Sequence, residues 1–187
     1  MNRILIALQL CFTLLFAGMF TNCYPRNPRI GFSNSACLFS LPCDTIPELN
    51  QKIIDLVKKQ IGLTVGRGEC WDLAALVLNT TGANWDKQYG YGRQVDPDKE
   101  CVYPGDIIQF EGVKIKYIKG LTVFEETMGH HTAVINEVVS QGVFVLAHQN
   151  TGTSGRKVGL SNLDLKTIIA GKYQIYRPVQ EALGDRQ

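Results

Sequence analysis

The fold of this chain is decided by one stretch, Gly66-Arg67-Gly68-Glu69-Cys70-Trp71-Asp72-Leu73-Ala74-Ala75-Leu76-Val77-Leu78. Its glycines indicate a loop, and the residues from Cys70 onward are good helix formers with apolar side chains on almost every side. The pattern predicts a buried central helix that begins at Cys70 and ends near Gly82. At a helix N-terminus, unpaired N–H groups and the helix dipole stabilise a thiolate, which is the form that attacks in nucleophilic catalysis. A buried cysteine in an apolar helix is also common, so this feature alone leaves both interpretations open.

A second helix is predicted immediately upstream. Thr45-Ile46-Pro47-Glu48 combines a capping residue, a glutamate three positions later and a proline in the first turn, which is typical of a helix start. Gly62 supplies the stop. The apolar residues between these points recur at helical spacing: Ile46, Leu49, Ile53, Leu56, Val57 and Ile61.

The second half of the chain has the period of β-strands. Short β-branched runs separated by glycines or polar turns occur at 106–110, 113–118, 132–139 and 143–147, and a last strand is expected at 173–176. Helices followed by such strands predict an α+β domain, with N-terminal helices packed on a small antiparallel sheet.

Between the two halves, residues 82–99 are expected to form a long surface loop. Its aromatic residues, Trp85, Tyr89 and Tyr91, either line a cleft or pack the loop against the domain. The sequence does not decide between these two roles.

The length and the net charge of the chain limit the classes of protein to which it can belong. The chain has 187 residues and 45% hydrophobic residues, enough for one domain with a proper core. The net charge of +2 is too small to favour nucleic acid or an anionic membrane surface as a partner. The loop around Gly66 and Gly68 lacks the Lys-Ser/Thr of a phosphate-binding loop, so a nucleotide is not expected, and neither is any cofactor.

The N-terminus indicates export. Met1-Asn2-Arg3 is a short basic start, and the uncharged apolar run from Ile4 to Phe20 has the length of a secretory signal or a marginal anchor. We expect residues 1–22 to be a signal peptide or N-terminal anchor, 23–44 a linker, and 45–180 the folded domain. A buried N-terminal helix is disfavoured because the run is apolar on every face.

Cys23 follows the apolar run, so a lipoprotein, a cleaved signal and an uncleaved anchor all stay open. The expected location is extracytoplasmic. Contact with a membrane is expected only through the N-terminal segment or a lipid on Cys23.

Export would place the remaining cysteines in an oxidising compartment. Cys37 and Cys43 lie close together in the sequence and could form a short disulfide. Cys23, Cys70 and Cys101 then remain, and catalysis is one reason for an exported protein to keep an unpaired thiol. The alternative is a Cys70–Cys101 disulfide, which would make the chain a non-catalytic exported binding protein.

All three histidines lie between residues 130 and 148. His130 and His131 open one predicted strand, His148 closes the next, and Asn150 follows two residues later. If the two strands are hairpin neighbours, a histidine at the start of one meets a polar group at the end of the other. That arrangement supplies the base and the orienting residue that a Cys-His pair needs.

A metal site is disfavoured. Adjacent strand residues such as His130 and His131 point to opposite faces, which argues against joint ligation. The cysteines and histidines also lack the Cys-x-x-Cys or His-x-x-x-His spacing of a strong zinc site.

Four segments occur in one order between roughly Leu63 and Arg177, and together they resemble the CHAP and NlpC/P60 group of papain-like cysteine peptidases and amidases. They are Gly68-Glu69-Cys70-Trp71, Pro104-Gly105-Asp106-Ile107-Ile108-Gln109-Phe110, His131-Thr132-Ala133-Val134-Ile135 and His148-Gln149-Asn150. The resemblance implies a papain-like fold in which Cys70 is the nucleophile and His131 the general base. His131 is preferred to His130 because the family histidine stands two residues before an alanine, here Ala133. The third role falls to His148 or Asn150.

Together with export, the resemblance implies a peptidoglycan endopeptidase or amidase that acts on cell-wall peptides. An acyltransferase or a deamidase of the same fold is the alternative. The sequence departs from the family at 112–129, a long insertion, and in lacking a recognisable side-chain oxyanion donor before Cys70. Glu69 beside the thiol also disfavours a thiolate. Asp106 is expected to be structural, turning the chain at the start of its strand.

Overall fold

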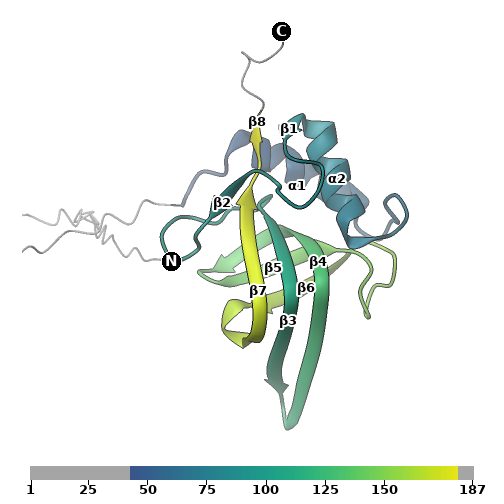
Figure 1. The fold of residues 1–187 in the computed structure, drawn as a ribbon, viewed down its shortest axis with the longest axis vertical. Coiled ribbons are helices and arrows are strands. Elements are labelled where there is room, and N and C mark those ends of the chain that lie inside the picture. The colour runs from purple at the N-terminus through teal and green to yellow at the C-terminus, as the bar shows by residue number, and fades with distance from the viewer. Residues whose placement is uncertain (1–42, 181–187) are drawn as a thin grey trace, which may run out of the picture. The chain divides into compact units, whose positions relative to one another are not determined.

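The computed structural model describes residues 43–180, in which two helices and eight strands are arranged as Figure 1 shows. The predicted signal or anchor segment, most of the predicted linker, and Cys23 and Cys37 lie outside the described residues. Neither helix of the described part is long and apolar enough to cross a membrane. The elements are α1 (Glu48–Gln60), α2 (Cys70–Thr81), β1 (Ala83–Asn84), β2 (Arg93–Val95), β3 (Ile107–Lys119), β4 (Thr122–Ser140), β5 (Val143–His148), β6 (Gly159–Asp164), the 3-10 helix η1 (Leu165–Thr167), β7 (Ile168–Arg177) and β8 (Val179–Gln180).

The central feature is an antiparallel sheet of six strands in the order β2-β7-β3-β4-β5-β6, and β1 pairs separately with β8. The predicted α+β class is therefore confirmed. The strand that carries the adjacent histidines, β4, is hydrogen-bonded to β5, which ends at His148. The predicted hairpin between these strands is thus also present.

The two helices differ in how well the sequence predicts them. α2 begins at Cys70 and ends at Thr81, followed by Gly82 in the left-handed conformation (φ 69°), as predicted. α1 begins at Glu48, and its N-cap is Pro47 rather than the predicted Thr45. A residue that precedes proline is disfavoured in helical conformation, so the helix cannot extend back to Thr45.

Apolar side chains on the two faces of the sheet form two cores. In β4, Val134 packs with the helices in the first core, whereas Ala133 and Ile135 belong to the second. Because the second core takes residues from all six strands, the sheet curls around it. One residue from each strand, in chain order, is Val95, Ile108, Ala133, Phe144, Leu163 and Ile175. Consecutive residues of β4 therefore face two different buried environments.

The stretch 112–129, expected to be a bulky insertion, is the distal part of a long β-hairpin. The predicted strands at 106–110 and 113–118 are one strand, β3, which pairs with β4 from Ile107↔Val134 to Lys119↔Thr122. The hairpin extends away from the helices (Figure 1). The extra residues therefore lengthen two strands of the sheet instead of forming a separate loop.

The predicted surface loop at 82–99 is partly wrong, because it contains β1 and β2 and two buried aromatic residues. Trp85 and Tyr91 lie in the first core, with ring centroids 5.9 Å apart. Tyr89 is exposed. Two of the three aromatic residues thus pack this segment against the domain.

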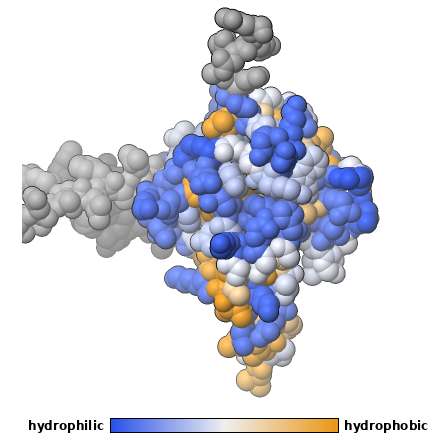
Figure 2. All heavy atoms as spheres, viewed as in Figure 1, coloured by the Kyte–Doolittle hydropathy of each residue, from blue (hydrophilic) through white to orange (hydrophobic). Residues whose placement is uncertain are grey.

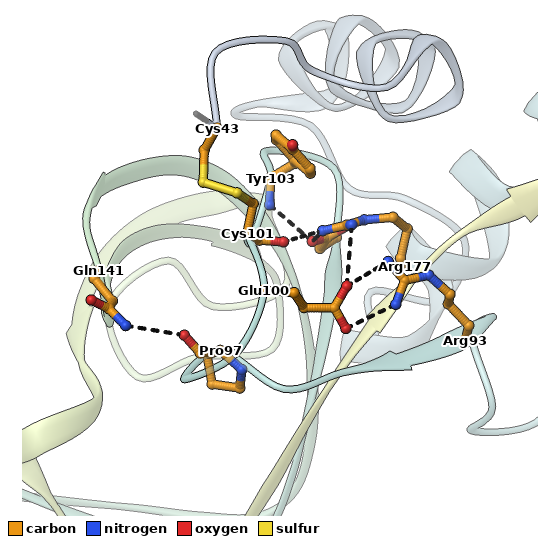
Figure 3. Close-up of a disulfide and its surroundings, with 9 residues drawn as sticks. Cys43, Arg93, Pro97, Glu100, Cys101, Tyr103, Gln141 and Arg177 are labelled. Atoms are coloured by element: carbon orange, nitrogen blue, oxygen red, sulfur yellow. Dashed lines mark hydrogen bonds and ion pairs between the residues drawn. A yellow bond between two sulfur atoms is a disulfide. The ribbon is translucent and has the colours of Figure 1, made fainter. Parts of the chain in front are cut away.

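A disulfide joins Cys43 to Cys101 (Figure 3), with a Cα–Cα distance of 5.7 Å. Both pairings considered from the sequence, Cys37–Cys43 and Cys70–Cys101, are therefore wrong. Proximity in the fold decides the partner of Cys43, because the segment before α1 passes the loop that leads into β3. Cys70 is a free thiol.

Asp106, beside this disulfide, has the structural role that the sequence predicts. Its carboxylate is fully buried and accepts hydrogen bonds from Arg177 (Nε 3.1 Å, Nη2 2.8 Å) and from the backbone N–H of Tyr103 (2.9 Å). It thereby connects the start of β3 to the end of β7.

Candidate active site

Cys70 is the first residue of α2, and its side chain is partly buried. The loop before it is held by Asp72, whose carboxylate accepts hydrogen bonds from the backbone N–H groups of Arg67 (2.7 Å) and Glu69 (3.2 Å). Burial raises the pKa of Asp72, but these bonds and the nearby Arg67 guanidinium outweigh it, so the pKa is lowered overall. Asp72 is therefore charged at neutral pH and fixes the entry into the helix.

Gln149 holds the same loop from the sheet, and sequence reasoning did not assign it a role. Its side chain is fully buried: Oε1 accepts from the N–H of Val65 (3.1 Å), and Nε2 donates to the carbonyls of Val65 (2.9 Å) and Glu69 (2.7 Å). The sequence feature that could have identified Gln149 is its position between two candidate site residues, His148 and Asn150. A buried amide with three partners fixes the loop that precedes Cys70.

His131 and His148 meet across the β4–β5 pair. His131 Nε2 lies 2.9 Å from His148 Nδ1, and both side chains are buried. His148 Nε2 in turn lies 2.8 Å from the hydroxyl of Ser161 in β6. Ser161 lay in no predicted strand, and no sequence motif marks it.

The hydrogen bonds from His131 to His148 and from His148 to Ser161 can all be donated in the same direction. If His131 carries its proton on Nε2, it donates to His148 Nδ1, and His148 then donates from Nε2 to Ser161 Oγ. His131 Nδ1 keeps its lone pair, and no described residue hydrogen-bonds to it. Burial, reinforced by His130, lowers the pKa of His131 to about 4, and burial and His131 lower the pKa of His148 to about 4. Both imidazoles are therefore neutral at pH 7.

The thiol lies beside the strand segment that carries both adjacent histidines. Cys70 Sγ is 4.0 Å from the carbonyl oxygen of His130, the peptide group that joins His130 to His131. Within residues 43–180, Sγ makes no hydrogen bond to an imidazole. The structure therefore brings the nucleophile candidate to the start of the histidine strand, and brings His131 directly to His148.

The side chain of His130 lies on the face of β4 opposite to that of His131. Its ring is about half exposed, with Nδ1 2.8 Å from Glu111 Oε2 and the ring of Tyr89 edge-on at 4.2 Å. The hydrogen bond to His130 is the largest effect on Glu111 and lowers the pKa of this carboxyl group. Gln109 holds the other carboxylate oxygen at 3.0 Å. His130 thus has an acidic partner, whereas His131 has a neutral one.

Asn150, the other candidate for the third role, does not contact His131. Its amide donates to Glu69 Oε2 at 2.8 Å, and its backbone has a φ of 61°. Glu69 Oε1 is 3.2 Å from Arg156 Nη2, so the negative charge next to the thiol is paired. The structure therefore places His148 next to His131, and Asn150 at the loop that carries Cys70.

The other requirements of the site can be supplied by the backbone. The first N–H groups of α2, at Cys70 and Trp71, have no acceptor within the helix, and such groups can hold an oxyanion. Among the residues that the structure describes, no group of three histidine, cysteine or acidic side chains is placed to hold a metal ion.

Comparison with known proteins identifies a family for most of the chain. Residues 47–187 match the family model of the AIM3/BBC1 cysteine proteinase-fold domain. A crystal structure of Ly7917 with the hydrolyzing product of MDP is similar over 69% of this chain and 62% of that chain, with 16% identity and a TM-score of 0.42. Another structure of Ly7917 is similar over 68% of this chain and 62% of that chain, with 15% identity and a TM-score of 0.39. This chain thus spans 62% of the length of those chains. No curated protein matches it.

Proposed function

Because the chain belongs to the AIM3/BBC1 cysteine proteinase-fold domain family, we propose that it is a cysteine hydrolase of amide bonds, with Cys70 as nucleophile and His131 as general base. One observation carries this proposal. The hydrogen bond to His148 holds a buried, neutral imidazole, that of His131, at the start of the strand segment that the free thiol approaches: Cys70 Sγ, at the N-terminus of α2, lies 4.0 Å from the carbonyl oxygen of His130. A nucleophile, a base and an orienting group are the minimum set for acyl transfer to a thiol.

The reaction proceeds in two halves. His131 Nδ1 takes the thiol proton as Cys70 Sγ attacks the amide carbonyl carbon, and the N–H groups at the start of α2 hold the oxyanion. The carbon–nitrogen bond breaks when His131 returns that proton to the leaving amine, which leaves a thioester on Cys70. His131 then removes a proton from water as its oxygen attacks the thioester, and the thiolate leaves with that proton. Throughout, His148 Nδ1 accepts a hydrogen bond from the Nε2–H group of His131.

His131 fits the role of base better than His130 does. No described residue hydrogen-bonds to its Nδ1, whereas His130 Nδ1 lies 2.8 Å from Glu111 Oε2. Burial also keeps His131 in the neutral form at pH 7, which is the form that a general base needs.

The proposed substrate is a cell-wall peptide, which would make the protein a peptidoglycan endopeptidase or amidase. Support comes from the four ordered motifs, which resemble those of CHAP and NlpC/P60 enzymes. Support for an extracytoplasmic location comes from the basic start and apolar run at the N-terminus. The Cys43–Cys101 disulfide adds to this support, since structural disulfides persist mainly in oxidising compartments.

The test is to incubate the full chain with muropeptides in H₂¹⁸O and to analyse the products by mass spectrometry. Hydrolysis places one ¹⁸O atom in the new carboxyl group, and Cys70→Ala abolishes the product. Transfer of the acyl group to an added amine, without ¹⁸O, would instead identify the acyltransferase alternative. If neither product nor a thioester on Cys70 forms with muropeptides or with a panel of peptide amides, the hydrolase proposal is wrong.

A further inference from the structure

The distal end of the β3–β4 hairpin carries apolar side chains that no described residue covers. Leu121 at the turn is fully exposed, and Ile118, Val123 and Phe124 are exposed by 73%, 52% and 39%. Figure 2 shows these apolar residues gathered at the end of the hairpin, away from the helices. We call Tyr117–Phe124 the tip. Exposed apolar residues are ordinary when scattered, but a cluster at one extremity indicates a binding surface.

The tip carries apolar side chains on both faces, together with Lys119 and Thr122 next to its turn. Ile118 pairs with Val123, so their side chains share one face, while Tyr117 and Phe124 share the other, with their rings stacked 5.3 Å apart. A groove on a partner protein would cover one face of a hairpin and leave the other in water. A bilayer surrounds whatever enters it, so two apolar faces with an apolar turn between them fit lipid better than a protein groove.

Three lysines lie in or next to the tip: Lys114, Lys116 and Lys119. Of the carboxylates of the hairpin, the two nearest the tip are Glu125, which is 3.1 Å from Lys116, and Glu126, which accepts a hydrogen bond from the hydroxyl of Tyr117 at 2.8 Å. Lys172 lies farther away, at the base of the hairpin, where β7 pairs with β3.

Over residues 113–129 three lysines stand against two glutamates, so this part of the hairpin has a net charge of +1. Lysines next to an apolar tip can contact the headgroups of an anionic leaflet.

We propose that the tip inserts into the interfacial region of an anionic lipid bilayer. This surface is independent of Cys70 and of the proposed hydrolase activity. Because β4 runs continuously from the tip to His131, insertion would hold the candidate site roughly 30 Å from the turn, at about 3.4 Å per strand residue.

The test uses a fluorophore at the tip, so that the N-terminal apolar segment of the full chain does not obscure the result. Leu121→Trp is compared with the parent protein in vesicles of phosphatidylglycerol and phosphatidylcholine containing brominated lipid. The matched control is Val139→Trp, since Val139 is an exposed residue at the other end of β4. We expect a blue shift and quenching for Leu121→Trp only, and at least about tenfold weaker partitioning into pure phosphatidylcholine.

Two results would overturn the proposal. The first is a Leu121→Trp signal that lipid leaves unchanged, or that Val139→Trp matches. The second is a lipid-free dimer in sedimentation that Leu121→Glu dissociates, which would make a second copy of the chain the occupant of the tip.

Discussion

His130 and His131 are neighbours in the chain but belong to different parts of the molecule. His131 is buried beside Phe110 and bonded to another imidazole, His148, while His130 is half exposed and bonded to the carboxylate of Glu111. The alternation of a β-strand produces this difference, because successive side chains point to opposite faces. The pair therefore belongs to two imidazole–partner dyads, one neutral and buried, the other acidic and exposed, and Cys70 Sγ lies 4.0 Å from the carbonyl oxygen of His130, between the two histidines. Chemistry at Cys70 should depend on only one of them.

The largest expected effect separates the two histidines directly. His131→Ala should lower kcat/KM for amide hydrolysis by roughly 10³-fold or more, as removal of a base from a catalytic set does. His130→Ala is the matched control and should change kcat/KM by less than about tenfold, since Glu111 occupies its Nδ1. Steady-state kinetics and the rate of Cys70 alkylation both report the difference. If His130→Ala has the larger effect, the roles are reversed.

The next effect concerns the orienting residue. His148→Ala should lower kcat by roughly 10²-fold with little change in KM, because it removes the group that fixes the tautomer and angle of His131. Asn150→Ala removes a bond to Glu69 instead and should change kcat by less than about threefold. Equal losses in the two variants would show that the third role is not confined to His148.

The buried dyad should also make stability depend on pH. The folded-state pKa values of His131 and His148 are about 4, below the ordinary value of 6.5, so the unfolded chain binds more protons between these values. Their contribution is therefore complete above about pH 6.5 and is lost as the pH falls towards 4. We expect a loss on the order of 2 kcal/mol for each of the two histidines in the free energy of unfolding between pH 7 and pH 4.5.

Urea titrations at the two pH values measure this loss, and His148→Gln should reduce it. A wild-type pH dependence that the variant retains in full would assign the loss to other groups.

The smallest effect is expected from the exposed dyad. Glu111→Gln should change the free energy of unfolding by less than about 1 kcal/mol, because an ion pair in contact with water contributes little. A thermal or urea unfolding curve of the variant, compared with that of the parent protein, measures the change. A loss larger than that of His148→Gln would mean that the exposed face, and not the buried one, fixes the start of β4.

The sequence predicted those elements whose conformation depends mainly on residues close together in the chain. The apolar run after Cys70 could form only a buried helix, and Gly82 supplied the left-handed residue that ends it. The sequence offered a hairpin between the histidine strands as a condition, and on that condition His148 or Asn150 would meet His131; the structure contains the hairpin and brings His148 to His131. What the sequence left open was the choice between His148 and Asn150, which depends on where β5 ends.

The remaining features depend on contacts between distant segments. Nothing near Cys43 identifies Cys101 as its partner, because the pairing follows from the path of the chain around α1. Gln149 binds a loop 84 residues away, and Ser161 lies in a strand with too little apolar character to be recognised. Residues 113–118 were predicted as a strand, but the returning strand at 122–131 was not, because its apolar and polar residues do not alternate in the usual way.

The end of β5 has a mechanical consequence for the enzyme we propose. Three consecutive residues serve both halves of the site: His148 bonds to the base, while Gln149 and Asn150 bond to the loop that precedes the nucleophile. The proposed base and nucleophile are therefore held by the same three residues, 148–150. A shift of this segment would change both the distance between His131 and Cys70 and their relative orientation. The exposed turn that follows is closed by hydrogen bonds between Thr151 and Gly155. An insertion in this turn would therefore lower the rate of the proposed reaction by displacing residues 148–150, although every reacting group would still be present.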